Sequence, residues 1–484
     1  MDRSVYFNGS WERGRGAAFE NLNPADGNVT WRGSAASEAQ VTSAVQSARD
    51  AFNTWGKRPQ KDRTAVLEAY AKALEARADK IAEAISRDMG KVAWEARAEA
   101  GAMVAKVGIS IKAQEERAGT KQLDAAFGSA ELGHRPHGVM AVFGPFNFPG
   151  HLPNGHIVPA LLAGNTCVFK PSEQAPSVAE IMADAFEEAG LPSGCLTIVH
   201  GARETGQALL NADINGLLFT GSATTGTLFH RHFAGRPDVI LALEMGGNNP
   251  LIVWDADNID AAADIAALSA FYTTGQRCSC ARRLIVPDDD FGQKVIEAVI
   301  ERARSLQIGS SEEPDTFMGP LVSEAAAQQA IDFQMKLSKL GGKSLRRLKR
   351  LDRGHGFVSA GVIDMTGAKD IPDEELFGPL LQVYRVPDFD AAIDQANSTR
   401  FGLAGGLISD DPNLWEFAKL HMRAGILNRN RPTAGASGSL PFGGPGLSGN
   451  FRPGAYYAAD YCAWPQASQI APEPQPMTAQ GFKT

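Results

Sequence analysis

The sequence predicts an α/β protein with parallel sheets covered by helices. Runs made only of apolar residues alternate with amphipathic helical patterns, and this alternation resumes after Gly247. A strand covered on both faces has such a continuous apolar run, and strand–helix–strand repetition is typical of βαβ units. The 484 residues are enough for two or three domains with a large core.

The N-terminal part, to about residue 35, is expected to form short strands and turns, because Asn8-Gly9 and Asn23-Pro24-Ala25-Asp26-Gly27 are turn sequences. Two helices are expected next. The second has apolar residues at steps of three and four, which is typical of one buried stripe, and Met89-Gly90 ends it. The stripe consists of Leu67, Tyr70, Leu74, Ala78, Ile81 and Ile85.

Residues 138–245 are expected to form parallel strands with helices between them. One of these helices, near residues 178–189, has an apolar face and ends at Gly190-Leu191-Pro192. Ligands of such sheets bind beyond the carboxyl ends of the strands. The strands are expected at residues 139–143, 166–170, 196–199, 217–220 and 239–243.

A strand at 284–286 and a helix near 290–306 indicate a second α/β unit. The segment from Gly119 to Pro136 is polar and weakly patterned, so composition alone predicts a surface loop there. The six basic residues between Lys343 and Arg353 fit a solvated helix or strand edge better than a nucleic-acid patch. The stretch from Ala455 to Trp464 is aromatic and strand-like.

The composition excludes several classes of protein. A net charge of −8 argues against nucleic acid as a partner, and no apolar stretch is long enough to span a membrane. The N-terminus lacks an apolar signal core, and the five cysteines are odd in number and irregularly spaced, so free thiols and a cytoplasmic location are expected. No metal site is expected, because His230-Arg231-His232 has no second ligand pair at a useful spacing.

Two segments suggest covalent chemistry: Gly275-Gln276-Arg277-Cys278-Ser279-Cys280 and, about thirty residues earlier, Leu243-Glu244-Met245-Gly246-Gly247. A cysteine thiolate can attack an electrophilic carbon, and a carboxylate can activate the water that releases the product. Neither segment is specific alone, since a single cysteine is more often a buried hydrophobe and a single glutamate a solvated charge.

Further segments accompany these two in a fixed order, and the whole series resembles the NAD(P)-dependent aldehyde dehydrogenases over nearly the full chain. The accompanying segments are Phe146-Asn147-Phe148-Pro149, Lys170-Pro171-Ser172-Glu173, Gly221-Ser222-Ala223-Thr224-Thr225-Gly226 and Glu375-Leu376-Phe377-Gly378-Pro379. The resemblance implies that Cys278 is the nucleophile and that Glu244 is the general base for thioester hydrolysis. It also implies that the Asn147 amide and the Cys278 backbone amide stabilise the oxyanion, and that Cys280 lines the pocket without reacting.

The same resemblance assigns a dinucleotide site. The turn Gly221-Ser222-Ala223-Thr224-Thr225-Gly226 would present its amides to a pyrophosphate at a helix N-terminus, although by itself it could equally be a plain strand-to-helix turn. Lys170, Ser172 and Glu173 would contact the adenosine ribose, and a carboxylate there favours NAD over NADP. Glu375 and Phe377 would hold the nicotinamide ribose and ring; helix capping or core packing is the alternative for each.

We therefore expect an aldehyde dehydrogenase-like fold in three parts. Residues 1–118 and 138–245 would form the parallel-sheet NAD-binding domain, and residues 246–450 the α/β catalytic domain. Residues 119–137 and 451–484 would form a small β oligomerisation arm with a tail, so a homodimer or a larger homo-oligomer is expected.

The resemblance, which extends through the segments from Asn428 to Pro465, implies that the substrate is a small aldehyde that carries carboxylates. Arg277 and Arg431 are the candidate residues to bind them, because arginine grips carboxylates bidentately, although each could instead be a structural arginine. Another aldehyde, a catalytically silent binding protein of the same fold and a thiol hydrolase are the alternatives. Retention of Asn147, Glu244 and Cys278 argues against a silent protein, and no histidine–asparagine context around Cys278 supports a hydrolase.

Overall fold

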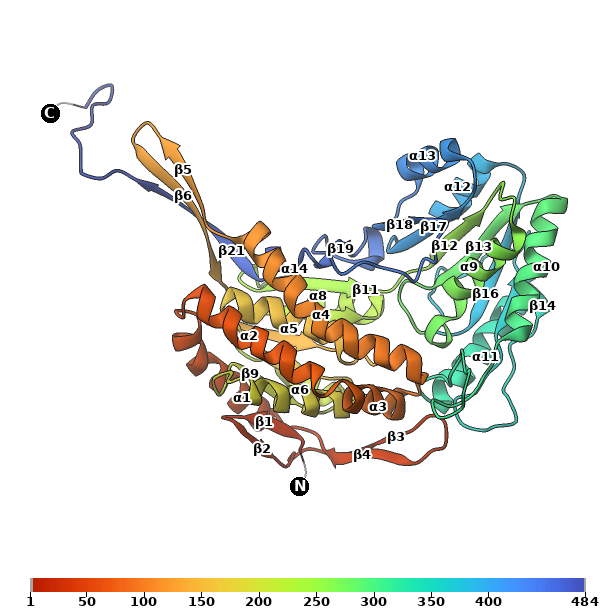
Figure 1. Ribbon diagram of the computed structural model, residues 1–484, viewed down its shortest axis with the longest axis horizontal. Helices are drawn as coiled ribbons and strands as arrows, with labels where there is room; N and C mark the ends of the chain where they lie inside the picture. Colours follow the sequence, from red (N-terminus) through yellow and green to blue (C-terminus); the bar gives the residue numbers. More distant parts are fainter. Residues whose placement is uncertain (1–2, 483–484) are drawn as a thin grey trace.

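The computed structural model describes residues 3–482 and contains two seven-stranded sheets and a small arm. Figure 1 shows the sheets and their helices as two halves side by side, with the arm projecting from the first half away from the second. The predicted α/β architecture is therefore confirmed. No helix in residues 3–482 is both long and apolar enough to cross a bilayer.

The first sheet is built mainly from parallel strands with two short antiparallel strands at one edge. In order across the sheet the strands are β11 (Ile240–Met245), β10 (Gly216–Gly221), β7 (Val139–Phe143), β8 (Thr166–Lys170), β9 (Leu196–Val199), β1 (Val5–Phe7) and β2 (Ser10–Glu12). A separate antiparallel pair, β3 (Ala18–Leu22) and β4 (Val29–Ser34), follows β2 in the chain. The five parallel strands lie within a few residues of their predicted positions, and the N-terminal strands fall in the segment expected to form short strands and turns.

Helices cover both faces of this sheet. On one face Met140 and Val142 pack under α2 (Gln60–Glu75), α3 (Ala78–Met89), α4 (Ala93–Ala118), α5 (His151–Ala163) and α6 (Ser177–Glu188). On the other face Ala141 and Phe143 pack under α1 (Glu38–Trp55), α7 (Arg203–Leu210) and α8 (Ala223–His232). Successive strand residues point to opposite faces, so a run with no polar residue is what two covered faces require.

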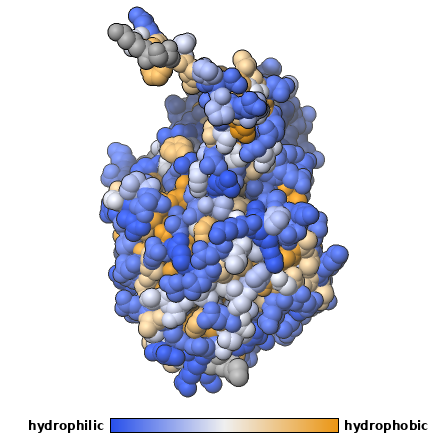
Figure 2. Space-filling view, turned by 90° about the vertical axis from the view of Figure 1, so that its left-hand side faces the viewer, coloured by the Kyte–Doolittle hydropathy of each residue, from blue (hydrophilic) through white to orange (hydrophobic). Residues whose placement is uncertain are grey.

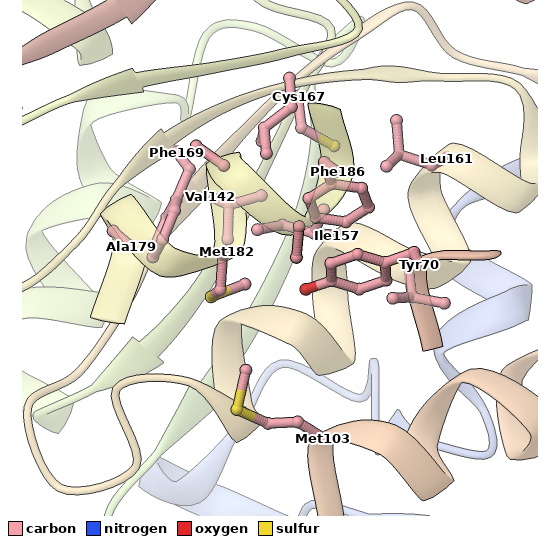
Figure 3. Close-up of a cluster of buried hydrophobic side chains, with 14 of the residues drawn as sticks. Tyr70, Met103, Val142, Ile157, Leu161, Cys167, Phe169, Ala179, Met182 and Phe186 are labelled. Carbon is pink, nitrogen blue, oxygen red and sulfur yellow. The ribbon is translucent and has the colours of Figure 1, made fainter. Parts of the chain in front are cut away.

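Figure 3 shows part of the first of these cores, in which the rings of Tyr70 and Phe186 stack with centroids 3.5 Å apart. The expected single helix with the apolar stripe is in fact two, because α2 ends at Glu75 and α3 begins at Ala78. The Arg77 side chain donates to the Ala73 carbonyl at the end of α2, and the stripe continues because both helices face the same core. Gly90 ends α3 in the left-handed conformation, as its sequence indicates.

The second sheet is parallel except for β14 at one edge. Across it lie β14 (Lys343–Arg346), β15 (Gly361–Asp364), β16 (Leu380–Val386), β13 (Ala281–Pro287), β12 (Asn249–Val253), β17 (Ala404–Ile408) and β18 (Ile426–Arg429). Its helices are α9 (Ile259–Phe271) and α10 (Asp290–Ser305) on one face and α11 (Glu324–Lys339), α12 (Phe389–Asn397) and α13 (Pro412–His421) on the other. The first four residues of the basic run that starts at Lys343 form the edge strand β14.

The arm is an antiparallel sheet in which β6 (Gly128–Pro136) pairs with β5 (Lys121–Ala125) on one side and with β21 (Ala463–Ile470) on the other. The loop expected from composition at Gly119–Pro136 is therefore replaced by strands. The strand expected at Ala455–Trp464 is largely wrong, because α14 (Ala458–Tyr461) occupies its middle and β21 begins only at Ala463. Figure 2, which views the molecule from the arm's side, shows hydrophobic residues scattered among hydrophilic ones. The domain limits given above remain a prediction.

Candidate active site

The carboxyl ends of β8, β7 and β10 meet at one edge of the first sheet. The strand β7 pairs with β8 on one side and with β10 on the other, and the chain runs from β7 to β9 in one direction before it returns to β10. Such a reversal opens a crevice that binds ligands in α/β sheets. Lys170 and Gly221 are the last residues of β8 and β10, and Asn147 follows β7.

The turn from Gly221 to Gly226 joins β10 to α8. Ser222 is the N-cap of α8, and its hydroxyl accepts a hydrogen bond from the Thr225 amide at 3.2 Å. The amides of Ala223 and Thr224 have no partner inside the helix, as is normal for a first turn, so they can bind an anion. A side chain at Gly226 would collide with Met245, which explains the glycine there. The residues in this turn thus fit a dinucleotide pyrophosphate.

Lys170 ends β8 and is buried, and its ammonium donates to the Pro171 carbonyl at 3.1 Å. The ammonium lies 3.6 Å from the carboxylate of Glu173, whose side chain is 45% exposed. Burial lowers the pKa of Lys170, and Glu173 opposes this shift. Ser172 accepts from the Gln174 amide at 3.2 Å. The Lys170 ammonium and the accessible Glu173 carboxylate therefore lie together beside the crevice.

The loop that carries Cys278 starts in strained backbone. Thr273, Thr274 and Gly275 follow α9 with φ values of 51°, 57° and 71°, and such values are uncommon for residues other than glycine. Contacts from other parts of the chain hold this conformation: the Thr273 hydroxyl donates to the Glu95 carboxylate and the Thr274 hydroxyl to the Gly319 carbonyl, each at 2.8 Å. The loop then turns into β13 with Cys278 half-buried at its tip.

Asn249 fixes the other side of this loop. Its amide nitrogen donates to the carbonyl oxygens of Cys278 at 2.7 Å and Cys280 at 2.8 Å, and its amide oxygen accepts from the Ala404 amide at 3.0 Å. Sequence reasoning missed Asn249. The available signal was a polar residue opening the apolar strand β12 directly after the segment with Glu244.

Asn147 lies against the same loop. Its side chain is buried, and its amide nitrogen donates to the Gln276 carbonyl at 2.9 Å, which leaves its second hydrogen for another acceptor. The Asn147 carbonyl accepts from Lys91, which forms a buried ion pair with Glu99. Asn147 is thus held from both sides next to the cysteine loop.

Glu244 lies near the end of β11, with its carboxyl group buried. Burial raises its pKa to about 8, while the nearby Lys106 ammonium and a hydrogen bond from the Gly454 amide act in the opposite direction. A carboxyl group with a pKa close to neutral can both accept and return a proton.

One cavity of about 240 Å³ adjoins several of these groups, but Asn147 and the buried Cys280 are not among its lining residues, so Cys280 does not line the pocket as expected. Cys278, Glu244 and Arg277 line it, with Lys106 and His151 on further walls. Arg431 is exposed and is not among the lining residues. Burial, with Glu375 and Glu244 nearby, raises the pKa of the Cys278 thiol, so a base must remove its proton before it attacks.

Comparison with known proteins agrees with this geometry. A model of the aldehyde dehydrogenase family matches residues 11–465. The chain belongs to the aldehyde dehydrogenase family. An N-succinylglutamate 5-semialdehyde dehydrogenase from a Caulobacter species is 54% identical over 472 residues, which cover 97% of this chain and 96% of the relative. The protein of the same name from Burkholderia multivorans is 50% identical over 466 residues, 96% of each chain.

The aldehyde dehydrogenase fold is confirmed by solved structures. An aldehyde dehydrogenase from Brucella melitensis biovar abortus superposes with a TM-score of 0.90 at 29% identity, covering 97% of each chain. The 1-pyrroline-5-carboxylate dehydrogenase from Thermus, solved with bound NAD, has a TM-score of 0.90 at 29% identity, covering 96% of this chain and 92% of that one.

In this aldehyde dehydrogenase Glu375 and Phe377 lie beside the cysteine loop because Arg282 holds them there. The Arg282 guanidinium is 3.2 Å from the Glu375 carboxylate and lies 5.5 Å from the centre of the Phe377 ring. Arg282 also donates to the Gly275 carbonyl at 2.7 Å and the Arg277 carbonyl at 2.9 Å. Sequence reasoning missed this buried arginine, which nothing in the local pattern distinguishes from its neighbour Arg283.

Arg277 has partners of its own within the aldehyde dehydrogenase cavity. Its guanidinium forms an ion pair with Glu95 at 2.6 Å and donates to the Thr273 hydroxyl at 2.8 Å. The guanidinium also lies near the rings of Phe148 and Tyr272, at 5.2 and 4.8 Å from their centres. Arg277 is therefore positioned at the cavity wall, with its charge already matched by a carboxylate.

Proposed function

We propose that this aldehyde dehydrogenase oxidises N-succinyl-L-glutamate 5-semialdehyde to N-succinyl-L-glutamate with NAD, the fourth step of arginine catabolism by the succinyltransferase route. The observation that carries this proposal is the full-length similarity to relatives of that name, 54% and 50% identical. The cavity chemistry supports it, since the substrate carries an aldehyde and two carboxylates and the cavity holds a thiol, a carboxyl group and cations.

In the proposed reaction Cys278 gives its proton to a water molecule in the cavity, and its sulfur bonds to the aldehyde carbon. The carbonyl oxygen becomes an oxyanion, which accepts hydrogen bonds from the Asn147 side chain and the Cys278 backbone amide. Preorganised donors of this kind lower an activation barrier by roughly 3–4 kcal/mol each. The contact of Asn147 with Gln276 at 2.9 Å supports this role, because it keeps the amide close to the loop that carries the nucleophile.

Bound NAD supplies the acceptor for the hydride that the tetrahedral carbon releases. The first-turn amides at Gly221–Gly226 would bind its pyrophosphate, and Lys170, Ser172 and Glu173 the adenosine ribose. Glu375 and Phe377 would face the nicotinamide ribose and ring. The accessible carboxylate of Glu173 accepts from a 2′-hydroxyl and repels a 2′-phosphate, which supports NAD rather than NADP.

The acyl group then remains on Cys278 as a thioester. Glu244 removes a proton from a water molecule, the hydroxide adds to the thioester carbon, and the carbon–sulfur bond breaks to release the carboxylic acid. The pKa of about 8 supports this role, because a base of this strength accepts a proton from water more readily than an ordinary carboxylate does.

The proposed function is tested by following NADH at 340 nm with chemically prepared N-succinylglutamate 5-semialdehyde. Succinic semialdehyde, glutamate semialdehyde and betaine aldehyde form the comparison panel, and Cys278→Ala is the control. We expect the succinylated aldehyde to have the highest kcat/KM and the variant to form no NADH. A higher value for another aldehyde would reassign the substrate, and NAD binding without turnover of any aldehyde would indicate a silent relative.

We also propose that the arm joins copies of this chain into a homodimer or larger homo-oligomer in the cytoplasm. Leu123, Trp464 and Ile470 lie on the arm with 61%, 43% and 44% of their surface exposed. Within residues 3–482, β5 and β21 each pair on one side only, and an open strand edge with exposed apolar residues favours association. Light scattering after size-exclusion chromatography is the test, and a monomeric mass would contradict this assembly.

A further inference from the structure

Lys106 is a buried cation in the cavity. It lies on α4, its residue is 2% exposed, and its ammonium donates to the Ala455 carbonyl at 2.8 Å. Among the residues that the structure describes, no carboxylate lies within 4.0 Å of this ammonium. An ammonium has three donors, so Lys106 retains the capacity to bind an anion that enters the cavity.

The other basic groups around the cavity are either paired with a carboxylate or neutral. Arg277 is paired with Glu95 at 2.6 Å, and Lys91 is paired with Glu99. Burial lowers the pKa of His151 to about 4, so this ring is neutral at physiological pH. Burial lowers the pKa of Lys106 to about 8, and the Glu244 carboxylate opposes this shift. With no carboxylate in ion-pair contact, the buried ammonium is costly unless a ligand completes it.

Lys106 is held next to the part of the cavity where Glu244 lies. The Gly454 amide donates to Glu244, and the carbonyl of the next residue, Ala455, accepts from Lys106. The short strand β20 (Gly454–Ala455) therefore orients both the proposed base and the ammonium. The Lys106 stem also packs beside Gly155 on α5, where a Cβ atom would lie in ordinary contact, 3.7 Å from the Lys106 Cε atom.

We propose that Lys106 binds the α-carboxylate of the substrate and so determines the specificity for aldehydes that carry this group. The α-carboxylate is the one on the carbon that is bonded to the amide nitrogen. This inference rests on the proposed function. Three carbons separate the α-carboxylate from the aldehyde carbon, whereas the succinyl carboxylate is much farther away. A cation oriented by the same short strand as Glu244 therefore matches the nearer carboxylate.

The test of this contact compares two aldehydes. One is N-succinylglutamate 5-semialdehyde, and the other is N-succinyl-4-aminobutanal, which lacks only the α-carboxylate. The measured quantity is the ratio of kcat/KM for the first aldehyde to that for the second. We expect the wild-type ratio to exceed about 10, the effect of one charged hydrogen bond. In Lys106→Met and Lys106→Gln the ratio should fall at least about tenfold, mainly through KM, and Lys106→Arg should restore part of it.

Lys112→Met is the matched control, because Lys112 lies on the same helix with its side chain 69% exposed. Its ratio should equal that of the wild type. A wild-type ratio near 1 overturns the inference without any variant, so the test does not depend on the variants folding. An equal loss for both aldehydes in Lys106→Met also overturns it, because Lys106 would then act on Glu244 instead of on the substrate. A wild-type enzyme whose highest kcat/KM is with an unrelated aldehyde would contradict the proposed function, and with it this inference.

Discussion

The side-chain amide of Asn249 donates to the backbone carbonyl of Cys278 at 2.7 Å. The two residues are 29 positions apart in the chain, and the same amide group also holds Cys280. The proposed nucleophile lies in a loop, and its position therefore depends on Asn249 of strand β12. This relationship gives the first prediction.

Replacing Asn249 with Ala should loosen the cysteine loop. The Cys280 carbonyl and the Ala404 amide would lose a buried partner, and each such loss costs about 1–3 kcal/mol. We expect a lower melting temperature and a kcat reduced by at least about tenfold, with the KM for NAD little changed. The melting curve and steady-state kinetics measure these effects; an unchanged kcat would show that Asn249 does not position the nucleophile.

Glu244→Gln should separate the two halves of the reaction. Acylation would still form one NADH per active subunit, but thioester hydrolysis would stop because no base activates water. Rapid mixing should therefore show a burst of NADH without steady turnover. Continued turnover at the wild-type rate would assign the base to another residue.

In the wild type the rate of thioester hydrolysis should depend on the charge of Glu244. The pKa of this carboxyl group is raised to about 8, so the group is mostly protonated at pH 7 and becomes a base as the pH rises. We expect the hydrolysis rate to rise between pH 6.5 and 8.5 and then to level off. Single-turnover measurements of the pre-formed thioester check this, and a flat profile over that interval would contradict it.

Arg277→Leu and Arg431→Leu should differ in stability. Arg277 neutralises the buried Glu95, and removal of one partner from a buried ion pair typically costs about 3–5 kcal/mol. Arg431 is exposed, so its replacement should change stability by less than about 0.5 kcal/mol. Urea unfolding measures both.

The same pair of variants tests the predicted carboxylate contacts. If Arg277 and Arg431 bind the substrate, each replacement raises the KM for the succinylated aldehyde. An unchanged KM in both variants would refute the assignment. Since Arg431 does not line the cavity, its variant is the stricter test of the two.

Glu173→Gln should relax the preference for NAD. The carboxylate repels a 2′-phosphate, and Lys170 lies 3.6 Å away as a cation that can attract it once the carboxylate is gone. We expect the ratio of kcat/KM for NADP to that for NAD to rise about tenfold. Glu180→Gln, on α6 and away from this contact, is a control that should leave the ratio unchanged.

Much of the fold could be predicted from local sequence. Strands such as Val139–Phe143 contain only apolar residues, and residues beside one another in the chain are sufficient to indicate burial on both faces. Gly90 and the turn at Gly221–Gly226 also carry their signals locally, because a left-handed cap and a helix N-terminus depend on a few consecutive residues. The arm at residues 121–136 was not predictable from composition and entered only through the family resemblance.

The sequence by itself therefore determined the order of strands and helices and the residue types available for chemistry. Only the tertiary structure decided which buried basic side chains are paired with a carboxylate and which are not. Arg277 finds Glu95 182 positions away, whereas Lys106 reaches the cavity with a backbone carbonyl as its partner, and nothing in either local sequence distinguishes these outcomes. The physical reason is that burial and ion pairing depend on distances between segments remote in the chain, which only packing of the two sheets and α4 sets.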